Sequence, residues 1–147
     1  HTTLELNGPL CGCGNRGCWE MLASNRAAVR YYSRSGETAN SPSYLELLAL
    51  ADQGDVKAAK ALDTQALFLG RGLRMLATGL APVAIVIVGE ITRAWHRLAP
   101  ANEKEVTTYP LPGKMPRIQP AYDGETARLR GTVALVLQKH FAASSFL

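Results

Sequence analysis

A long amphipathic segment dominates the distribution of apolar and polar residues along the chain. From Asp55 to Leu80, leucine and alanine recur in steps of three and four, the spacing that places apolar side chains on one face of an α-helix. Asp55 is placed to cap this helix. Gly70 and Gly72 lie inside it, and each costs about 1 kcal/mol in helix propensity. We therefore expect another helix or a ligand to approach the backbone at these glycines.

Two shorter helices precede this segment. Ser24 is placed to cap a helix that continues to about Tyr32. Ser43 and Glu46 have the spacing of a capping box, which predicts a second helix that ends near Gly54.

β-branched residues fill most of the apolar run at 83–88, which a glycine follows. This pattern predicts a central parallel strand that is buried on both faces, and a helix over 91–99 after it. Residues 117–121 predict a short strand, which Pro120 confines to an edge or an end of the sheet. Helices that alternate with strands in this way favour an α/β fold.

The last predicted helix runs from about Glu125 to His140. Proline, glycine and polar residues dominate the stretches at 34–42 and 99–116, which predict loops. Four apolar residues of the last helix have helical spacing and are expected to form its buried face: Leu129, Val133, Val136 and Leu137.

The composition is that of an ordinary single globular domain. The chain has 147 residues, 47% of them hydrophobic, and a net charge of +4. This charge is well short of what a dedicated nucleic-acid-binding domain shows. No apolar run reaches the roughly 20 residues that a membrane span needs, and no signal peptide is visible. Because the sequence starts abruptly at His1, we expect it to be part of a longer protein.

All three cysteines, Cys11, Cys13 and Cys18, fall within one stretch of eight residues, with glycines between them. Zinc takes four ligands from cysteine and histidine, and glycine allows the backbone to wrap the sulfurs around one point. The spacing therefore favours a zinc site whose fourth ligand is water, a carboxylate or a histidine.

The chain has one histidine upstream of the cysteines, His1, and two far downstream on predicted helices, His96 and His140. The alternative to a metal site is a reduced or redox-active cysteine cluster, although redox pairs more often have the C-x-x-C spacing. A disulfide framework would need an oxidising compartment and usually more cysteines.

His1 is followed by nine residues and then by Cys-x-Cys-Gly-x-x-Gly-Cys-x-Glu. This pattern resembles the signature of the ROK family (repressors, open reading frames and kinases). The resemblance implies that one structural zinc is bound by His1, Cys11, Cys13 and Cys18. It also implies that His1 and Glu20 contact sugar hydroxyls, and a carboxylate is suited to accept hydrogen bonds from such hydroxyls.

The resemblance also implies the fold. Residues 1–147 would be the C-terminal half of an actin-like, ribonuclease-H-like ATPase fold, in which residues 1–20 form a zinc-stapled loop. The N-terminal part of the parent protein would lie upstream of His1 and is absent from this chain.

Two functions follow from the resemblance. The first is the C-terminal sugar-sensing and oligomerisation part of a transcriptional regulator, which binds DNA only through a domain outside this chain. The alternative is the C-terminal half of an ATP-dependent, glucokinase-like sugar kinase, with ATP and Mg²⁺ as cofactors and Gly89 beside the nucleotide. Since the family carries its catalytic base and phosphate loops upstream of His1, we expect this chain alone to be inactive. A third alternative is a zinc-stabilised structural module.

Two departures from the family pattern favour the regulator. The family has a glycine pair at the end of the apolar strand, next to the adenosine of ATP, whereas this chain has Val88 and Gly89. The branched side chain of Val88 would crowd a nucleotide. Ala81 also replaces the asparagine that commonly precedes the proline.

The resemblance implies the partners as well. They are a hexose, an amino sugar or a sugar phosphate, and identical chains in a dimer or tetramer. No membrane is expected as a partner, and the protein is expected to be cytoplasmic.

Overall fold

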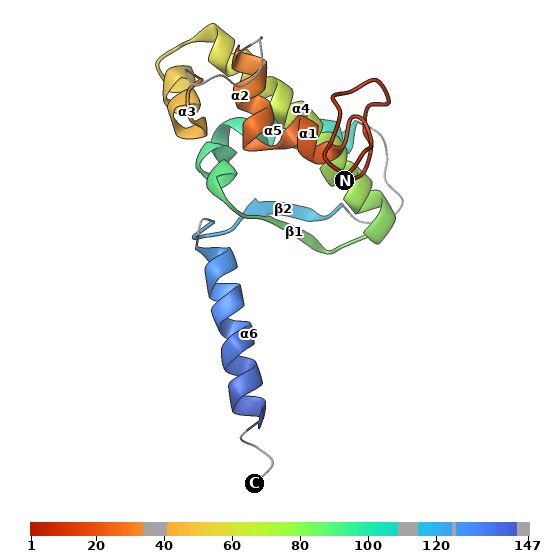
Figure 1. Ribbon diagram of the computed structural model, residues 1–147, viewed down its shortest axis with the longest axis vertical. Helices are drawn as coiled ribbons and strands as arrows, with labels where there is room; N and C mark the ends of the chain where they lie inside the picture. Colours follow the sequence, from red (N-terminus) through yellow and green to blue (C-terminus); the bar gives the residue numbers. More distant parts are fainter. Residues whose placement is uncertain (34–40, 109–114, 125, 144–147) are drawn as a thin grey trace.

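Helices make up most of the structure, and a short sheet lies at one edge of them. The computed structural model describes residues 1–33, 41–108, 115–124 and 126–143, so the predicted loops at 34–42 and 99–116 lie partly outside the described residues. In Figure 1 the N-terminal loop and most helices form a compact body on one side of the sheet, and the last helix extends away on the other side. In chain order the elements are α1 (Trp19–Ala23), α2 (Asn25–Ser33), α3 (Tyr44–Asp52), α4 (Val56–Leu80), β1 (Ala84–Ile87), the 3₁₀ helix η1 (Glu90–Ala94), α5 (Trp95–Thr107), β2 (Arg117–Pro120) and α6 (Ala127–Ala143).

The predicted long helix is confirmed as α4, which begins after Asp55 and ends at Leu80. Asp55 Oδ1 accepts hydrogen bonds from the backbone N–H groups of Lys57 at 2.8 Å and Ala58 at 2.9 Å. These bonds satisfy donors that the first turn of a helix leaves unpaired. Because α4 contacts α1, α2, α3 and α5, it is the element around which the body is built.

The capping box at the start of α3 is confirmed. The N–H of Glu46 donates to Ser43 Oγ at 3.3 Å, and the N–H of Ser43 donates to Glu46 Oε2 at 2.7 Å. The helix predicted after Ser24 is confirmed as α2. The sequence did not predict α1, a helix of five residues, because apolar periodicity does not show over so short a segment.

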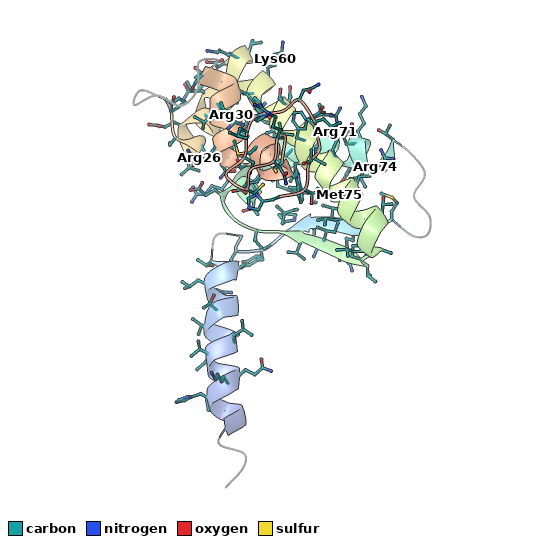
Figure 2. All side chains as sticks on the ribbon, turned by 45° about the vertical axis from the view of Figure 1, so that its right-hand side comes forward. Arg26, Arg30, Lys60, Arg71, Arg74 and Met75 are labelled. Atoms are coloured by element: carbon teal, nitrogen blue, oxygen red, sulfur yellow. The ribbon has the colours of Figure 1, made fainter. Side chains whose placement is uncertain are left out.

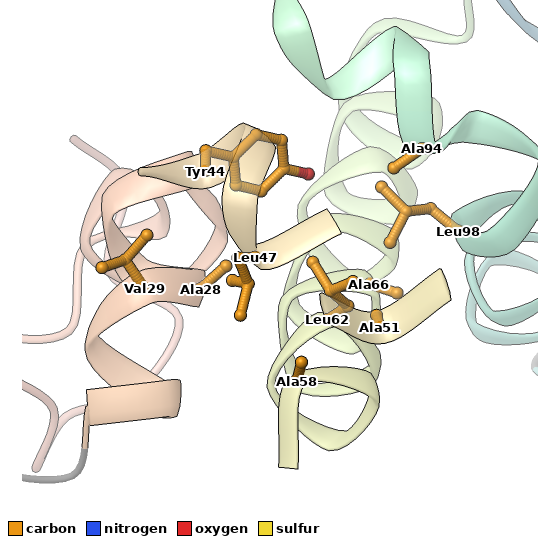
Figure 3. Packing of buried hydrophobic residues seen from close by; sticks show 10 residues of the cluster. All are labelled: Ala28, Val29, Tyr44, Leu47, Ala51, Ala58, Leu62, Ala66, Ala94 and Leu98. Carbon is orange, nitrogen blue, oxygen red and sulfur yellow. The ribbon is translucent and has the colours of Figure 1, made fainter. Parts of the chain in front are cut away.

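The main core lies between α2, α3, α4 and the η1–α5 segment. Gln65 is fully buried beside it. The Tyr44 hydroxyl donates to Gln65 Oε1 at 3.0 Å, and Gln65 Nε2 donates to the carbonyl of Ala23 at 3.2 Å. Both ends of this amide are paired, so its burial carries no unsatisfied polar group. The buried hydrophobic residues of this core, shown in Figure 3, are Ala28, Val29, Tyr44, Leu47, Ala51, Ala58, Leu62, Ala66, Ala94 and Leu98.

The helices α4 and α5 approach closely at Gly70. A Cβ atom on Gly70 would lie 2.7 Å from Cβ of Glu105 and 3.2 Å from Cα of Asn102, which is closer than the roughly 3.5–4.0 Å at which carbon atoms pack. The missing side chain therefore allows the two helices to meet, and the close packing predicted at this glycine is confirmed.

The sheet consists of β1 and β2, which are parallel and pair from Ala84 with Arg117 to Ile87 with Pro120. The predicted edge strand is confirmed as β2. The prediction that the apolar strand is buried on both faces is wrong, since Val86 is 52% exposed. Among the described residues β1 has one neighbouring strand, and helices cover only the face that carries Ile87.

Helix α5 continues through Pro100 to Thr107, where the sequence predicted an irregular stretch. Proline inside a helix removes one backbone hydrogen bond and is unfavourable. Leu98 and Val106 lie at helical spacing on the other side of α5 and are fully buried, and α5 packs against α4. Burial of this face of α5 outweighs the unfavourable effect of Pro100 on the helix. The predicted end of the helix, at residue 99, is therefore corrected to Thr107.

The last predicted helix is confirmed as α6, but its predicted buried face is wrong. Figure 1 shows α6 extending away from the body. At the beginning of the helix, Arg130 Nη1 lies 2.8 Å from Asp123 Oδ2 in the segment that leads into it. Within the described parts of the chain, no helix is long and apolar enough to cross a membrane. The residues expected to be buried on α6 are 65%, 49%, 64% and 49% exposed, in the order Leu129, Val133, Val136 and Leu137.

Candidate metal centre

The N-terminal loop folds back on itself. Thr3 forms an antiparallel bridge with Cys18, and Leu10 forms another with Arg16. These pairings place the first residues of the chain beside the end of the cysteine stretch, so that His1 lies next to the cysteines. Inside the Leu10–Arg16 bridge, the turn is closed by a hydrogen bond of 2.8 Å from the N–H of Cys11 to the carbonyl of Asn15.

Gly17 allows the two halves of the loop to cross. Its φ of 58° lies in the left-handed region, which favours glycine. A Cβ atom on Gly17 would lie only 1.7 Å from the carbonyl oxygen of Glu5. The carbonyl of Gly17 accepts a hydrogen bond from the N–H of Leu4 at 2.9 Å. A glycine at this position is therefore a requirement of the loop.

The four predicted ligands come together. His1 Nδ1 lies 3.3 Å from Cys11 Sγ, and Cys13 Sγ lies 3.5 Å from Cys18 Sγ. All four ligand atoms lie within 4.8 Å of one another. Bonds of about 2.0–2.3 Å to a tetrahedral zinc would place its ligand atoms about 3.3–3.8 Å apart. The cluster therefore fits one metal ion with small adjustments, and it is His1, rather than a downstream histidine, that joins the cysteines.

The three thiols have different surroundings. Cys11 and Cys18 are buried, whereas Cys13 is exposed, and all three are free of disulfides. Burial raises the pKa of the Cys18 thiol to about 11, while a hydrogen bond from the backbone of Asn15 lowers the pKa of Cys13. A bound cation would favour the thiolate form of each ligand. This donor set of three sulfurs and an imidazole suits zinc.

Glu20 lies beside the cluster, in the first turn of α1. Its Oε2 is 3.5 Å from His1 Nδ1, and the side chains of Glu20 and His1 are 63% and 57% exposed. A carboxylate that accepts hydrogen bonds and an imidazole that can donate or accept them thus face solvent together. The two residues predicted to contact a sugar are adjacent at the surface.

Gly89 lies apart from this cluster, at the end of β1. Its φ of 95° requires glycine, and its N–H donates to the carbonyl of Gly124 at 2.6 Å. The neighbouring Val88 side chain is 46% exposed. A hollow of about 680 Å³ lies at the C-terminal ends of the strands, lined by Thr92, Arg93, Gln119, Pro120, Ala121 and Tyr122.

The ROK family model matches residues 1–139. The chain belongs to the ROK family. It is 31% identical to the xylose repressor of Bacillus spizizenii over 143 residues, which cover 96% of this chain and 36% of the repressor. It is 34% identical to a glucokinase of Streptomyces coelicolor over 109 residues, which cover 63% of this chain and 34% of the glucokinase. The chain thus spans about a third of the length of these curated ROK relatives.

The fold is also that of ROK proteins. A solved ROK glucokinase from Streptomyces griseus, in complex with glucose and AMPPNP, superposes with a TM-score of 0.80 at 27% identity. The likeness covers 92% of this chain and 49% of that glucokinase. The predicted α/β fold of the actin-like sugar kinases is confirmed by this likeness. The assignment of this ROK chain to the C-terminal half of the fold stays a prediction.

Trp19 anchors the loop of this ROK chain to α4. Its Nε1 donates to the carbonyl of Phe68 at 3.0 Å, and its indole lies over Gly72, where a Cβ atom would be 1.9 Å from Trp19 Cε2. The approach predicted at Gly72 is therefore that of an aromatic ring. The sequence analysis did not identify Trp19 as the partner, because no local signal links a residue of the loop to a glycine on a distant helix.

An ion pair forms a second link between the loop and α4. Arg71 Nη1 lies 2.6 Å from Glu5 Oε1, and Figure 2 shows Arg71 on α4 beside the N-terminal loop. The two side chains are 42% and 45% exposed, so solvent weakens this pair. The packing of Trp19 on Gly72 is therefore the stronger of the two links.

Gly72→Ala should displace the indole of Trp19 and loosen residues 1–20, because the new Cβ atom would overlap the ring. We expect the free energy of unfolding to fall by about 1–3 kcal/mol, and hydrogen–deuterium exchange in residues 1–20 to become faster. Gly79→Ala is the matched control, since Gly79 lies in the same helix and has no atom within 4 Å of its missing side chain. Unchanged exchange in Gly72→Ala would contradict the anchoring role of Trp19.

Proposed function

We propose that this chain is the C-terminal, sugar-binding part of a ROK protein, in which a zinc ion holds residues 1–20 and thereby positions Glu20. The observation that carries this proposal is the cluster itself. Four ligand atoms lie within 4.8 Å of one another, and the Glu20 carboxylate lies 3.5 Å from one of them, His1 Nδ1.

The proposed role of the zinc is structural. Four protein ligands complete a tetrahedral site and leave no open position for water or substrate, which is the pattern of structural zinc. His1, Cys11, Cys13 and Cys18 would supply these ligands. The ion would hold Cys18, while Trp19, the residue between Cys18 and Glu20, is held on α4 by its hydrogen bond to the carbonyl of Phe68.

The proposed ligand is a hexose, an amino sugar or a sugar phosphate. Sugars are recognised by side chains that accept and donate hydrogen bonds at fixed positions, and Glu20 and His1 provide both at the surface. Similar proteins support this ligand class: a xylose repressor and a glucokinase in complex with glucose both resemble this chain.

We propose a transcriptional regulator as the parent protein, with a sugar kinase as the alternative. The relatives include both classes, so the family alone does not choose between them. The observation that supports the regulator is Val88, whose branched side chain replaces a glycine expected beside a nucleotide and is 46% exposed there. Gly89 and the similarity to glucokinases support the kinase, for which ATP and Mg²⁺ would be cofactors. We also propose that identical chains form a dimer or tetramer. In the regulator, DNA would be bound by a domain of the parent protein outside this chain.

The purified chain should carry about one zinc per chain, as expected for one four-ligand site. Chelation should accelerate hydrogen exchange in residues 1–20, because structural zinc contributes directly to folding. Affinity for zinc should fall as the pH is lowered, since thiols must lose their protons to bind. Elemental mass spectrometry measures the metal content.

Cys18→Ser should lose the zinc, whereas Glu20→Gln, which removes a charge beside the cluster but no ligand, should retain it. A fully folded chain without metal, with all three thiols reactive, would refute the zinc site.

Glu20→Gln in the parent protein should weaken sugar binding by about 10- to 100-fold, because a hydrogen bond to a charged group contributes about 1.5–3 kcal/mol. Isothermal titration calorimetry with glucose, xylose and N-acetylglucosamine tests this. Glu103→Gln, which changes an exposed carboxylate on α5, is the control and should bind like the unmodified protein. Equal affinities in the two variants would remove Glu20 from the sugar site.

The parent protein decides between regulator and kinase. For the regulator, we expect a sugar to change the affinity for operator DNA by at least about fivefold, the lower range of allosteric coupling, with no sugar phosphorylation in the presence of ATP and Mg²⁺. An electrophoretic mobility-shift assay and a coupled phosphorylation assay measure the two activities. Phosphoryl transfer without DNA binding would establish the kinase instead.

A further inference from the structure

Cys13 is the accessible member of the cysteine cluster, and a second thiol lies in contact with it. Its side chain is exposed, whereas those of Cys11 and Cys18 are buried. Cys13 Sγ lies 3.5 Å from Cys18 Sγ, while Cys11 Sγ lies 3.3 Å from His1 Nδ1. A reagent in solvent therefore meets Cys13 first, with the Cys18 thiol directly behind it.

The backbone around Cys13 leaves room for the two sulfur atoms to meet. A disulfide needs about 2.05 Å between its sulfurs, so Cys13 and Cys18 must approach each other by about 1.5 Å. Gly12 and Gly14 flank Cys13, and a Cβ atom on either glycine would have no atom within 4 Å. Cys18 is held by its antiparallel bridge to Thr3. The movement therefore falls to Cys13, at the unpacked tip of the loop.

We propose that a peroxide converts Cys13 and Cys18 into a reversible disulfide, and that this oxidation empties the metal centre. Redox-sensing cysteines are accessible thiols that lie next to a resolving cysteine, which is the arrangement of Cys13 and Cys18. The disulfide leaves Cys11 and His1 as ligands, two fewer than the four that a structural zinc takes. The state of the cysteine pair thereby decides whether a metal holds residues 1–20.

The oxidation takes two steps. The Cys13 thiolate attacks one oxygen of hydrogen peroxide, the O–O bond breaks, and a sulfenic acid and hydroxide form. The Cys18 thiolate then attacks the sulfur of this sulfenic acid, the S–O bond breaks, and a second hydroxide leaves as the S–S bond forms. The peroxide accepts the two electrons that the thiolates lose. A thiol reductant such as glutathione reverses the reaction by thiol–disulfide exchange.

Loss of the metal would act on Glu20. This residue follows Cys18 by two positions, and its Oε2 lies 3.5 Å from Nδ1 of His1, a second ligand. In the oxidised protein Trp19 still holds α1 on α4, but the imidazole of His1 loses the metal that would fix it. Oxidation therefore lowers the affinity for sugar. This consequence rests on the proposed function, whereas formation of the disulfide does not.

Peroxide treatment of the zinc-loaded parent protein tests the disulfide. The remaining thiols are alkylated, and trypsin then cleaves between Arg16 and Gly17, so that a disulfide from Cys13 to Cys18 joins two peptides. Fragment-ion mass spectrometry should find Cys11 alkylated and the other two cysteines linked. A zinc indicator should report about one zinc released per disulfide. Dithiothreitol with added zinc should restore both the thiols and the bound metal.

Cys11→Ser and Cys13→Ser are a matched pair of variants, since each removes one ligand and leaves two thiols. Cys11→Ser keeps Cys13 beside Cys18 and should form the disulfide. Cys13→Ser keeps only the two buried thiols, which react only when the loop opens. We expect its disulfide to form at least about tenfold more slowly, and equal rates in the two variants would contradict the proposal.

Three further results would overturn the proposal. One is thiols that stay reduced at a peroxide concentration that oxidises glutathione in the same sample. Another is oxidation of Cys13 to a sulfinic acid without a disulfide, which would remove Cys18 as the resolving thiol. The third is a disulfide between Cys13 and Cys18 that forms while the zinc stays bound.

Calorimetry with glucose, xylose and N-acetylglucosamine on the reduced and the oxidised parent protein measures the effect on sugar binding. We expect the affinity to fall at least about fivefold, the lower range of coupling between sites, and to recover after reduction with zinc. A reduced protein that binds no sugar but forms the disulfide would reject the sugar-binding function and support the redox pair. Equal sugar affinities before and after disulfide formation would reject the coupling of the redox pair to Glu20.

Discussion

Burial of the apolar face of α4 is the interaction on which the rest of the structure depends. Both hydrophobic clusters include leucines of this helix, Leu62 in one and Leu69 and Leu73 in the other, and each fully buried leucine contributes about 1.5–3 kcal/mol. The face is interrupted at Gly70 and Gly72, where α5 and the indole of Trp19 approach the helix. The same helix therefore organises the core and determines where the N-terminal loop is attached.

The candidate site combines two kinds of restraint. Directly before Glu20, the backbone is held by packing of Trp19 on α4, a contact between distant parts of the chain that requires no metal. One residue earlier, Cys18 belongs to a cluster of thiols and an imidazole, which a bound metal ion would stabilise. Glu20, the proposed sugar contact, follows both restraints directly, and a side chain on such a rigid support would lose little conformational freedom when a ligand binds.

Regulators and kinases of the ROK family both resemble this chain, and the cluster of His1 and the cysteines lies apart from the region whose sequence departs from the family pattern. That region is the end of β1, where Val88 and Gly89 meet the segment leading into α6. The exposed strand face and the exposed helix lie on the same side of the structure from which most helices are absent (Figure 1).

The sequence by itself determined the features that depend on neighbouring residues. The caps at Ser43 and Asp55 and the extent of α4 follow from spacings that local backbone geometry converts directly into structure. The resemblance to the ROK family implied the grouping of His1 with the cysteines, and the structure brings their ligand atoms within 4.8 Å of one another. Tertiary structure alone decided which apolar surfaces are covered. Four features depend on which distant segment lies opposite. They are the one-sided burial of β1, the continuation of α5 through Pro100, the exposure of α6 and the packing of Trp19 on Gly72. An apolar pattern in the sequence indicates that a surface favours burial. Only the folded chain shows whether that surface is buried and which residues bury it.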